Sequence, residues 1–169
     1  IQTITSHLIE RYGDDCLRFY WAVFNEPDLS SLFWRPNDWG ELMRFYDYTV
    51  DAVLRAFEDH GYDSSKVTVG GLELAAVRPD ALRLDEFLVH CSPTAEGKTP
   101  MRENAVFADP QMNGKRSKRV EALCAANGGK GSPCDYISVH SYSNAANAVM
   151  KITNAKTIAL QIDPAYYEK

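Results

Sequence analysis

The side chains best suited to chemistry stand in Asn25-Glu26-Pro27 and, far downstream, at His140 and Tyr142. A carboxyl group can protonate a glycosidic oxygen, while amide, imidazole and phenol groups can hold the hydroxyls of a sugar. These residue types together predict acid/base chemistry on a carbohydrate.

Polar residues of this kind lie at or just after the ends of three segments that we predict as short strands. The three segments are residues 17–24, which form an apolar and aromatic run, 67–71 and 135–140. The first has no polar alternation, which predicts a strand of a parallel sheet buried on both faces. The segments lead to Glu26, Glu73 and His140 respectively, and the carboxyl ends of barrel strands form the active-site rim. Core packing does not explain a polar set that converges from three strand ends.

Helical patterns alternate with these strands. Residues 1–12 repeat apolar side chains at helical spacing before Gly13, and Asp38 with Glu41 predicts a capped helix that Gly61 closes. Further helical patterns lie at residues 81–90, 119–126 and 144–162, of which 157–162 also fits a strand. This order predicts βαβ units and an α/β fold with a parallel sheet.

The motif around Glu26 resembles a known signature. Phe24-Asn25-Glu26-Pro27-Asp28-Leu29, after an aromatic strand, is similar to the Asn-Glu-Pro signature of clan A glycoside hydrolases. The wider pattern resembles family thirty-nine, the β-xylosidase and α-L-iduronidase group. The segments that carry this wider likeness are residues 7–13, 33–34, 46–56, 69–71 and 137–142.

The resemblance implies a TIM (β/α)8 barrel, of which this chain covers roughly strands four to six and their helices. Residues 1–169 would then be a partial barrel domain with an irregular insertion at about 92–130. The chain opens on a helical pattern without an initiator Met, so we expect it to be cut from a longer protein. The remainder of the barrel is therefore an expected partner.

The resemblance also implies roles for single residues. Glu26 would be the acid/base of a retaining hydrolase, Asn25 would hydrogen-bond the sugar 2-hydroxyl, and His140 and Tyr142 would line the pocket. The family's nucleophile is a Glu at the end of strand seven, which we expect beyond Lys169. Because a retaining glycosidase needs two carboxyls across the scissile bond, we expect the isolated chain to be inactive.

Structural roles remain open for each of these residues. Glu26 or Asn25 could be a turn residue, His140 a core histidine and Tyr142 a packing residue. Trp34, in the loop after the acid/base, could stack on a sugar ring or anchor the loop.

The roles of two further residues, Trp39 and Glu73, are also open. We favour a loop anchor for Trp39, which lies inside a helix start. Glu73 could be a pocket residue, a helix cap or half of a salt bridge. Their residue types alone do not decide between these roles.

Composition excludes several other classes. The net charge of -5 disfavours nucleic acid, and no run approaches the roughly 20 apolar residues of a membrane span. The four histidines lack metal-ligand spacing, and no phosphate loop predicts a cofactor. A disulfide between Cys124 and Cys134 is open, as is localisation, with secretion or a periplasmic location among the options.

Two functions from different classes fit this sequence. One is a retaining glycoside hydrolase that cleaves O-glycosidic bonds of a carbohydrate substrate. The alternative is a non-catalytic carbohydrate-binding or scaffold protein on the same barrel, and a barrel enzyme of unrelated chemistry is a third reading. A Glu at the end of strand seven would favour the enzyme.

Overall fold

The computed structural model describes residues 1–29, 32–35, 38–77, 83–92, 131–163 and 165–166. In chain order, these residues form α1 (Gln2–Tyr12), the 3-10 helix η1 (Gly13–Arg18), β1 (Tyr20–Ala22), α2 (Trp39–Asp59), the 3-10 helix η2 (Ser64–Lys66), β2 (Thr68–Gly70), α3 (Arg83–Cys91) and α6 (Ala145–Ile162). Helices and strands alternate as the sequence predicts, and residues 157–162 are helical. The predicted helix at 119–126 and most of the predicted insertion lie outside the described residues.

The strands are parallel. β1 pairs with β2 in the register Tyr20 to Thr68, Trp21 to Val69 and Ala22 to Gly70. The segment predicted as a third strand, residues 135–140, runs beside β2 and makes only isolated parallel bridges, from Gly70 to Tyr136 and from Leu74 to Val139. The prediction of a parallel sheet is confirmed, whereas the third strand is less regular than expected.

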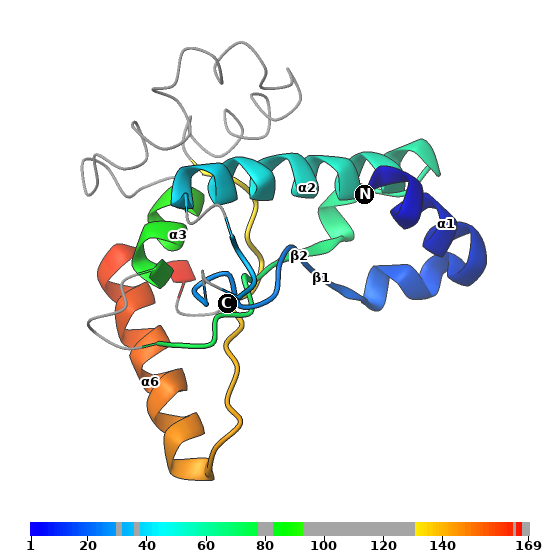
Figure 1. Cartoon of the computed structure of the whole chain (residues 1–169). Helices are drawn as coiled ribbons and strands as arrows, with labels where there is room; N and C mark the ends of the chain where they lie inside the picture. Colours follow the sequence, from blue (N-terminus) through cyan, green and yellow to red (C-terminus); the bar gives the residue numbers. More distant parts are fainter. Residues whose placement is uncertain (30–31, 36–37, 78–82, 93–130, 164, 167–169) are drawn as a thin grey trace.

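The first strand also differs from its prediction. The apolar run 17–24 predicts a strand buried on both faces, but β1 covers three residues with an exposed–intermediate–exposed pattern. Tyr20 is 71% exposed. The reason is that α2 covers one face of the β1–β2 pair (Figure 1), so only Trp21, between the two exposed residues, turns its side chain toward the helices.

The core lies between α2 and the two strands. Asp38 caps α2 by accepting a hydrogen bond from the Glu41 N–H at 3.1 Å, as predicted, although the Glu41 carboxylate pairs with Arg44. The apolar residues of α2 recur at helical spacing and give one strongly buried face. Its fully buried side chains include Leu42, Met43, Tyr46, Val50 and Phe57.

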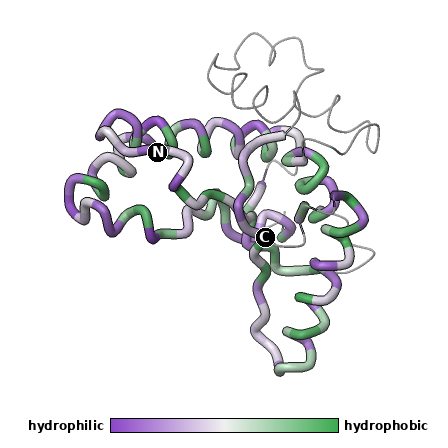
Figure 2. Tube along the Cα trace, turned by 180° about the vertical axis from the view of Figure 1, so that it is seen from behind, coloured by the Kyte–Doolittle hydropathy of each residue, from purple (hydrophilic) through white to green (hydrophobic). Residues whose placement is uncertain are grey.

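Helix α6 has far fewer buried residues than α2. In α6 only Ala155 and Ala159 are buried, while Val149, Met150 and Ile152 remain 48–62% exposed. Figure 2 shows hydrophobic stretches along this helix, which continues from the segment beside β2.

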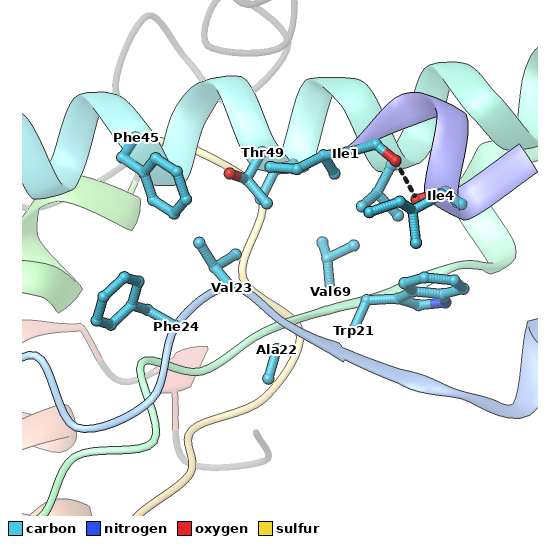
Figure 3. Close-up of a pocket in the computed structure, with 12 residues that line it drawn as sticks. Ile1, Ile4, Trp21, Ala22, Val23, Phe24, Phe45, Thr49 and Val69 are labelled. Carbon is cyan, nitrogen blue, oxygen red and sulfur yellow. Dashed lines mark hydrogen bonds between the residues drawn. The ribbon is translucent and has the colours of Figure 1, made fainter. Parts of the chain in front are cut away.

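An apolar cavity of about 410 Å³ lies where α1 meets α2 and β1. Figure 3 shows Ile4 of α1, Trp21 and Val23 of the first strand region and Phe45 of α2 around it. This cavity is lined mainly by hydrocarbon groups and does not include Glu26 or His140. It is therefore an uncovered part of the core and not the site of the predicted chemistry.

Gly70 permits the third segment to approach β2. A Cβ atom at this position would lie 2.6 Å from the carbonyl oxygen of Tyr136 and 2.9 Å from its ring. Backbone atoms cannot swing aside as a side chain can, so Gly70→Ala should separate the two segments. We expect a loss of about 1–3 kcal/mol in the free energy of unfolding, measured by urea denaturation. A variant as stable as the original would contradict this packing.

Candidate active site

Glu26 lies in the loop that follows β1 and is held by the backbone of the loop that follows β2. Its N–H donates to the carbonyl oxygen of Glu73 at 3.1 Å, and the residue is only 8% exposed. Its φ of 49° lies in the left-handed region, which costs a non-glycine residue about 1–3 kcal/mol and persists only where the surroundings hold it. The alternative that Glu26 is a surface carboxylate in a turn does not fit this burial.

Asp28 ties the same loop to the loop after β2. Its two carboxylate oxygens accept hydrogen bonds from the N–H groups of Ala75, at 3.0 Å, and Ala76, at 2.8 Å. Asp28 belongs to the motif around Glu26, but its residue type alone predicts no role. Carboxylates in loops often accept backbone N–H bonds, but the sequence did not indicate which N–H groups would lie within reach.

His140 completes the cluster from the third segment. Its Nδ1 lies 2.8 Å from Glu26 Oε1, although the two residues are 114 positions apart. Its Nε2 lies 3.1 Å from Glu73 Oε2, and the backbone N–H of His140 donates to the Leu74 carbonyl at 2.8 Å. The imidazole is thus clamped between two carboxylates from the ends of two parallel strands, as convergence at a sheet edge predicts.

This clamp changes the acidity of the imidazole. The hydrogen bond with Glu26 raises the pKa of His140; burial acts in the opposite direction, and the hydrogen bond with Glu73 adds to the increase. A carboxylate near an imidazole stabilises its charged form. His140 therefore stays protonated to a higher pH in the folded chain than it does in an unfolded one.

The raised pKa of His140 predicts a stability that depends on pH. Its contribution to folding is complete below about pH 6.5, the ordinary value for histidine, and is lost as the pH rises through the folded pKa. Urea denaturation across this range should therefore show a falling free energy of unfolding. The fall should be smaller in His140→Asn and unchanged in His7→Asn, which alters an exposed histidine. Equal pH dependence in His140→Asn would contradict the clamp.

Lys151 of α6 supports the cluster from outside. Its Nζ donates to the carbonyl oxygens of Ala75 at 2.6 Å and of His140 at 2.8 Å. Lys151 lies in the predicted helix 144–162, where its residue type alone indicates no role. The helix also carries Lys156, and the partners of Lys151 are backbone groups, which residue types do not reveal.

The other residues predicted to bind sugar lie in more exposed positions or in a different loop contact. Asn25 is exposed, and Tyr142 is 92% exposed, with its ring centroid 6.0 Å from that of His140. Trp34 donates its indole N–H to the Asp38 carbonyl at 2.8 Å, and its ring packs edge-on against Phe24. Trp34 therefore anchors its own loop, Asn25 and Tyr142 face solvent, and Tyr142 lies beside the cluster.

The comparison with family models decides the family. Residues 1–163 match the model described as glycosyl hydrolases family 39. The chain belongs to glycosyl hydrolase family 39. The resemblance first noted in the Asn-Glu-Pro motif is thus confirmed, and this family implies a TIM-barrel type of fold and glycosidase activity.

Searches of the curated proteins and of the solved structures found no match. None of the helices in the described part of this family 39 chain is long and apolar enough to cross a membrane. Within the described residues, no group of three or more His, Cys, Asp or Glu side chains could hold a metal ion. Cys134 donates its thiol to the Tyr136 carbonyl at 3.4 Å, and Cys124 lies outside the described residues.

Proposed function

We propose that Glu26 is the general acid/base of a retaining glycoside hydrolase. The observation that carries this proposal is the 2.8 Å contact between the largely buried Glu26 carboxyl and His140, at the edge where the strand ends meet. A carboxyl that is largely withdrawn from water but linked to a titratable partner can hold a proton and release it. Membership of family 39 supplies the reaction class.

In this mechanism Glu26 acts twice. Protonated Glu26 donates to the glycosidic oxygen as the bond to the leaving group breaks and a covalent glycosyl-enzyme forms. The resulting carboxylate then removes a proton from the water that attacks the intermediate, which restores protonated Glu26. The adjacent His140 lies where it can exchange a proton with Glu26 across their hydrogen bond.

The second carboxyl of such a mechanism must come from elsewhere in the barrel. Glu73 is the other carboxylate that the described residues place on the His140 ring, and it binds the opposite ring nitrogen from Glu26. It is therefore poorly placed to attack the same anomeric carbon. We propose a nucleophile supplied by the rest of the barrel and expect no turnover by the 169-residue chain alone.

The rest of the barrel is a proposed partner for a second reason. We assign β1, β2 and the segment 135–140 to barrel strands four, five and six. The cavity beside β1 and the exposed apolar residues of α6 are then surfaces that neighbouring strands and helices would cover.

The proposed substrate is a carbohydrate bound over this rim. Asn25 and Tyr142 are exposed beside the cluster, where they can contact sugar hydroxyls. His140 is 24% exposed at its side chain and can do so from within the cluster. We assign Trp34 a supporting role in shaping the loop, since its indole N–H is already bonded to Asp38.

Hydrolysis by a protein that carries the complete barrel tests this proposal. A series of aryl glycosides that differ in sugar and anomeric configuration should include at least one that releases its phenol in an enzyme-dependent way. Binding of a sugar, measured by calorimetry, without turnover of any member of the series would favour the non-catalytic carbohydrate-binding protein instead.

A further inference from the structure

The His140 imidazole has two carboxylate partners, of which the acid/base proposal uses one. Glu73 Oε2 lies 3.1 Å from Nε2, on the side of the ring away from Glu26. The side chains of His140 and Glu73 are each 24% exposed, so solvent screens their interaction only in part. Glu73 is therefore a third titratable member of the cluster, without an assigned role.

The backbone fixes Glu73 relative to both other members. Its φ of 46° is left-handed, like that of Glu26, and its carbonyl oxygen accepts the Glu26 N–H at 3.1 Å. The next residue, Leu74, accepts the His140 N–H at 2.8 Å. Strained conformations of this kind persist only where neighbouring structure holds them. The side chain of Glu73 thus leaves a backbone that is bonded to the loops carrying Glu26 and His140.

We propose that Glu73 is a positioning residue that fixes the tautomer of His140. An ionised carboxylate can only accept a hydrogen bond, so it selects the imidazole form with hydrogen on Nε2. The lone pair of Nδ1 then faces Glu26 and accepts from its protonated carboxyl. This inference rests on the proposed acid/base role of Glu26.

The protons balance in this arrangement. In one form Glu26 is protonated and His140 is neutral, while in the other the same proton lies on Nδ1 and the imidazolium bridges two carboxylates. Donation by Glu26 to a leaving oxygen removes one proton, and abstraction from water returns one. Without Glu73, hydrogen on Nδ1 of the neutral ring would donate to ionised Glu26 and favour the form that cannot act as an acid.

Other charged or titratable groups also face this cluster. Lys151 of α6 directs its Nζ at the carbonyl oxygens of His140 and Ala75, and its charge opposes protonation of the ring. Tyr136, in the same segment as His140, has a pKa raised first by its burial and then by the charge of Glu73. The exposed phenol of Tyr142 borders the imidazole. Among these groups, Glu26 and Glu73 are the ones that bond directly to the ring nitrogens of His140.

Nitrogen NMR of the labelled 169-residue chain tests the proposal without any activity. The His140 signals, assigned by their loss in His140→Asn, should show the form protonated on Nε2 once the ring is neutral. Glu73→Gln should lower the pKa of His140 and mix the two tautomers, because a glutamine amide can accept or donate. Glu10→Gln, which alters an exposed carboxyl, should change neither.

Two outcomes would overturn the role of Glu73. One is a neutral His140 protonated on Nδ1 in the unaltered chain, which needs no variant to fold. The other is a tautomer and a pKa of His140 that do not change in Glu73→Gln. Glu73→Asp, which keeps the charge, is the conservative control and should retain the original tautomer.

In the complete barrel, Glu73→Gln should lower kcat/KM about tenfold, a part of the 10²–10⁴-fold that acid/base catalysis contributes. It should also shift the pH profile, which a merely structural role would leave in place. The two proposals fail differently, because full activity in Glu26→Gln would remove the acid/base role while the NMR result could still stand.

Discussion

Glu26→Gln, in a protein that carries the complete barrel, is expected to lower kcat/KM on glycosides with poor leaving groups by about 10²–10⁴-fold. Glutamine has nearly the same shape as glutamate but can neither donate a proton to the glycosidic oxygen nor remove one from water. The side chain of Glu26 is 10% exposed and bonded to His140, so bulk water is poorly placed to replace it.

The loss should depend on the leaving group. A strongly activated phenolate departs without a proton, so its first step should be largely spared, and a comparison of alkyl and activated aryl substrates would measure the difference. Glu10→Gln, an identical change at an exposed carboxyl, should leave both rates unaltered. Unchanged turnover of an alkyl glycoside by Glu26→Gln would refute the assignment.

Phe57→Ala is expected to have the largest effect on stability, a loss of about 3–5 kcal/mol in the free energy of unfolding. Phe57 of α2 is fully buried. Its ring packs edge-on against Trp21 of β1 at 5.6 Å and against Tyr62 at 5.8 Å. Removing it opens a cavity between the helix and the strand that leads to Glu26.

Urea denaturation measures this loss, and Phe33→Ala is the matched control. Phe33 is 47% exposed, so the same chemical change should cost well under 1 kcal/mol there. A similar loss at both positions would contradict the description of the core. If Phe57→Ala also displaces Glu26, the NMR signals of His140 should shift, since the strand region and the cluster are connected through the loop after β1.

The helices could be predicted from local patterns because their spacing and caps are local properties. The apolar spacing of α2 and the Asp38 cap appear in the sequence and in the structure. Strand lengths could not, because they depend on partners far along the chain. Residues 17–24 are apolar and aromatic apart from Arg18, yet only Tyr20–Ala22 pair as a strand, while residues 135–140 make two isolated bridges.

The candidate site was predictable where residue type and strand position agree. Glu26 and His140 were both placed at strand ends, and they lie 2.8 Å apart. Glu73 remained open because a carboxylate after a strand suits several roles. Asp28 and Lys151 were missed, since both bind backbone groups, and a sequence does not reveal which backbone groups will need partners.

The role of Trp34 also could not be settled from residue type. An aromatic residue in a loop after an acid/base suits sugar stacking as well as loop packing, and the sequence left both open. Its indole N–H is bonded to the Asp38 carbonyl and its ring contacts Phe24, an interaction that closes the loop before α2.

Azide rescue of Glu26→Gln tests the acid/base assignment most directly. With an activated aryl glycoside, the variant in a complete barrel should accumulate its glycosyl-enzyme, because no base activates water. Azide needs no base, so it should restore turnover and yield a glycosyl azide with the anomeric configuration of the substrate, identified by proton NMR. A variant that azide does not accelerate, or a product of inverted configuration, would contradict Glu26 as the acid/base of a retaining hydrolase.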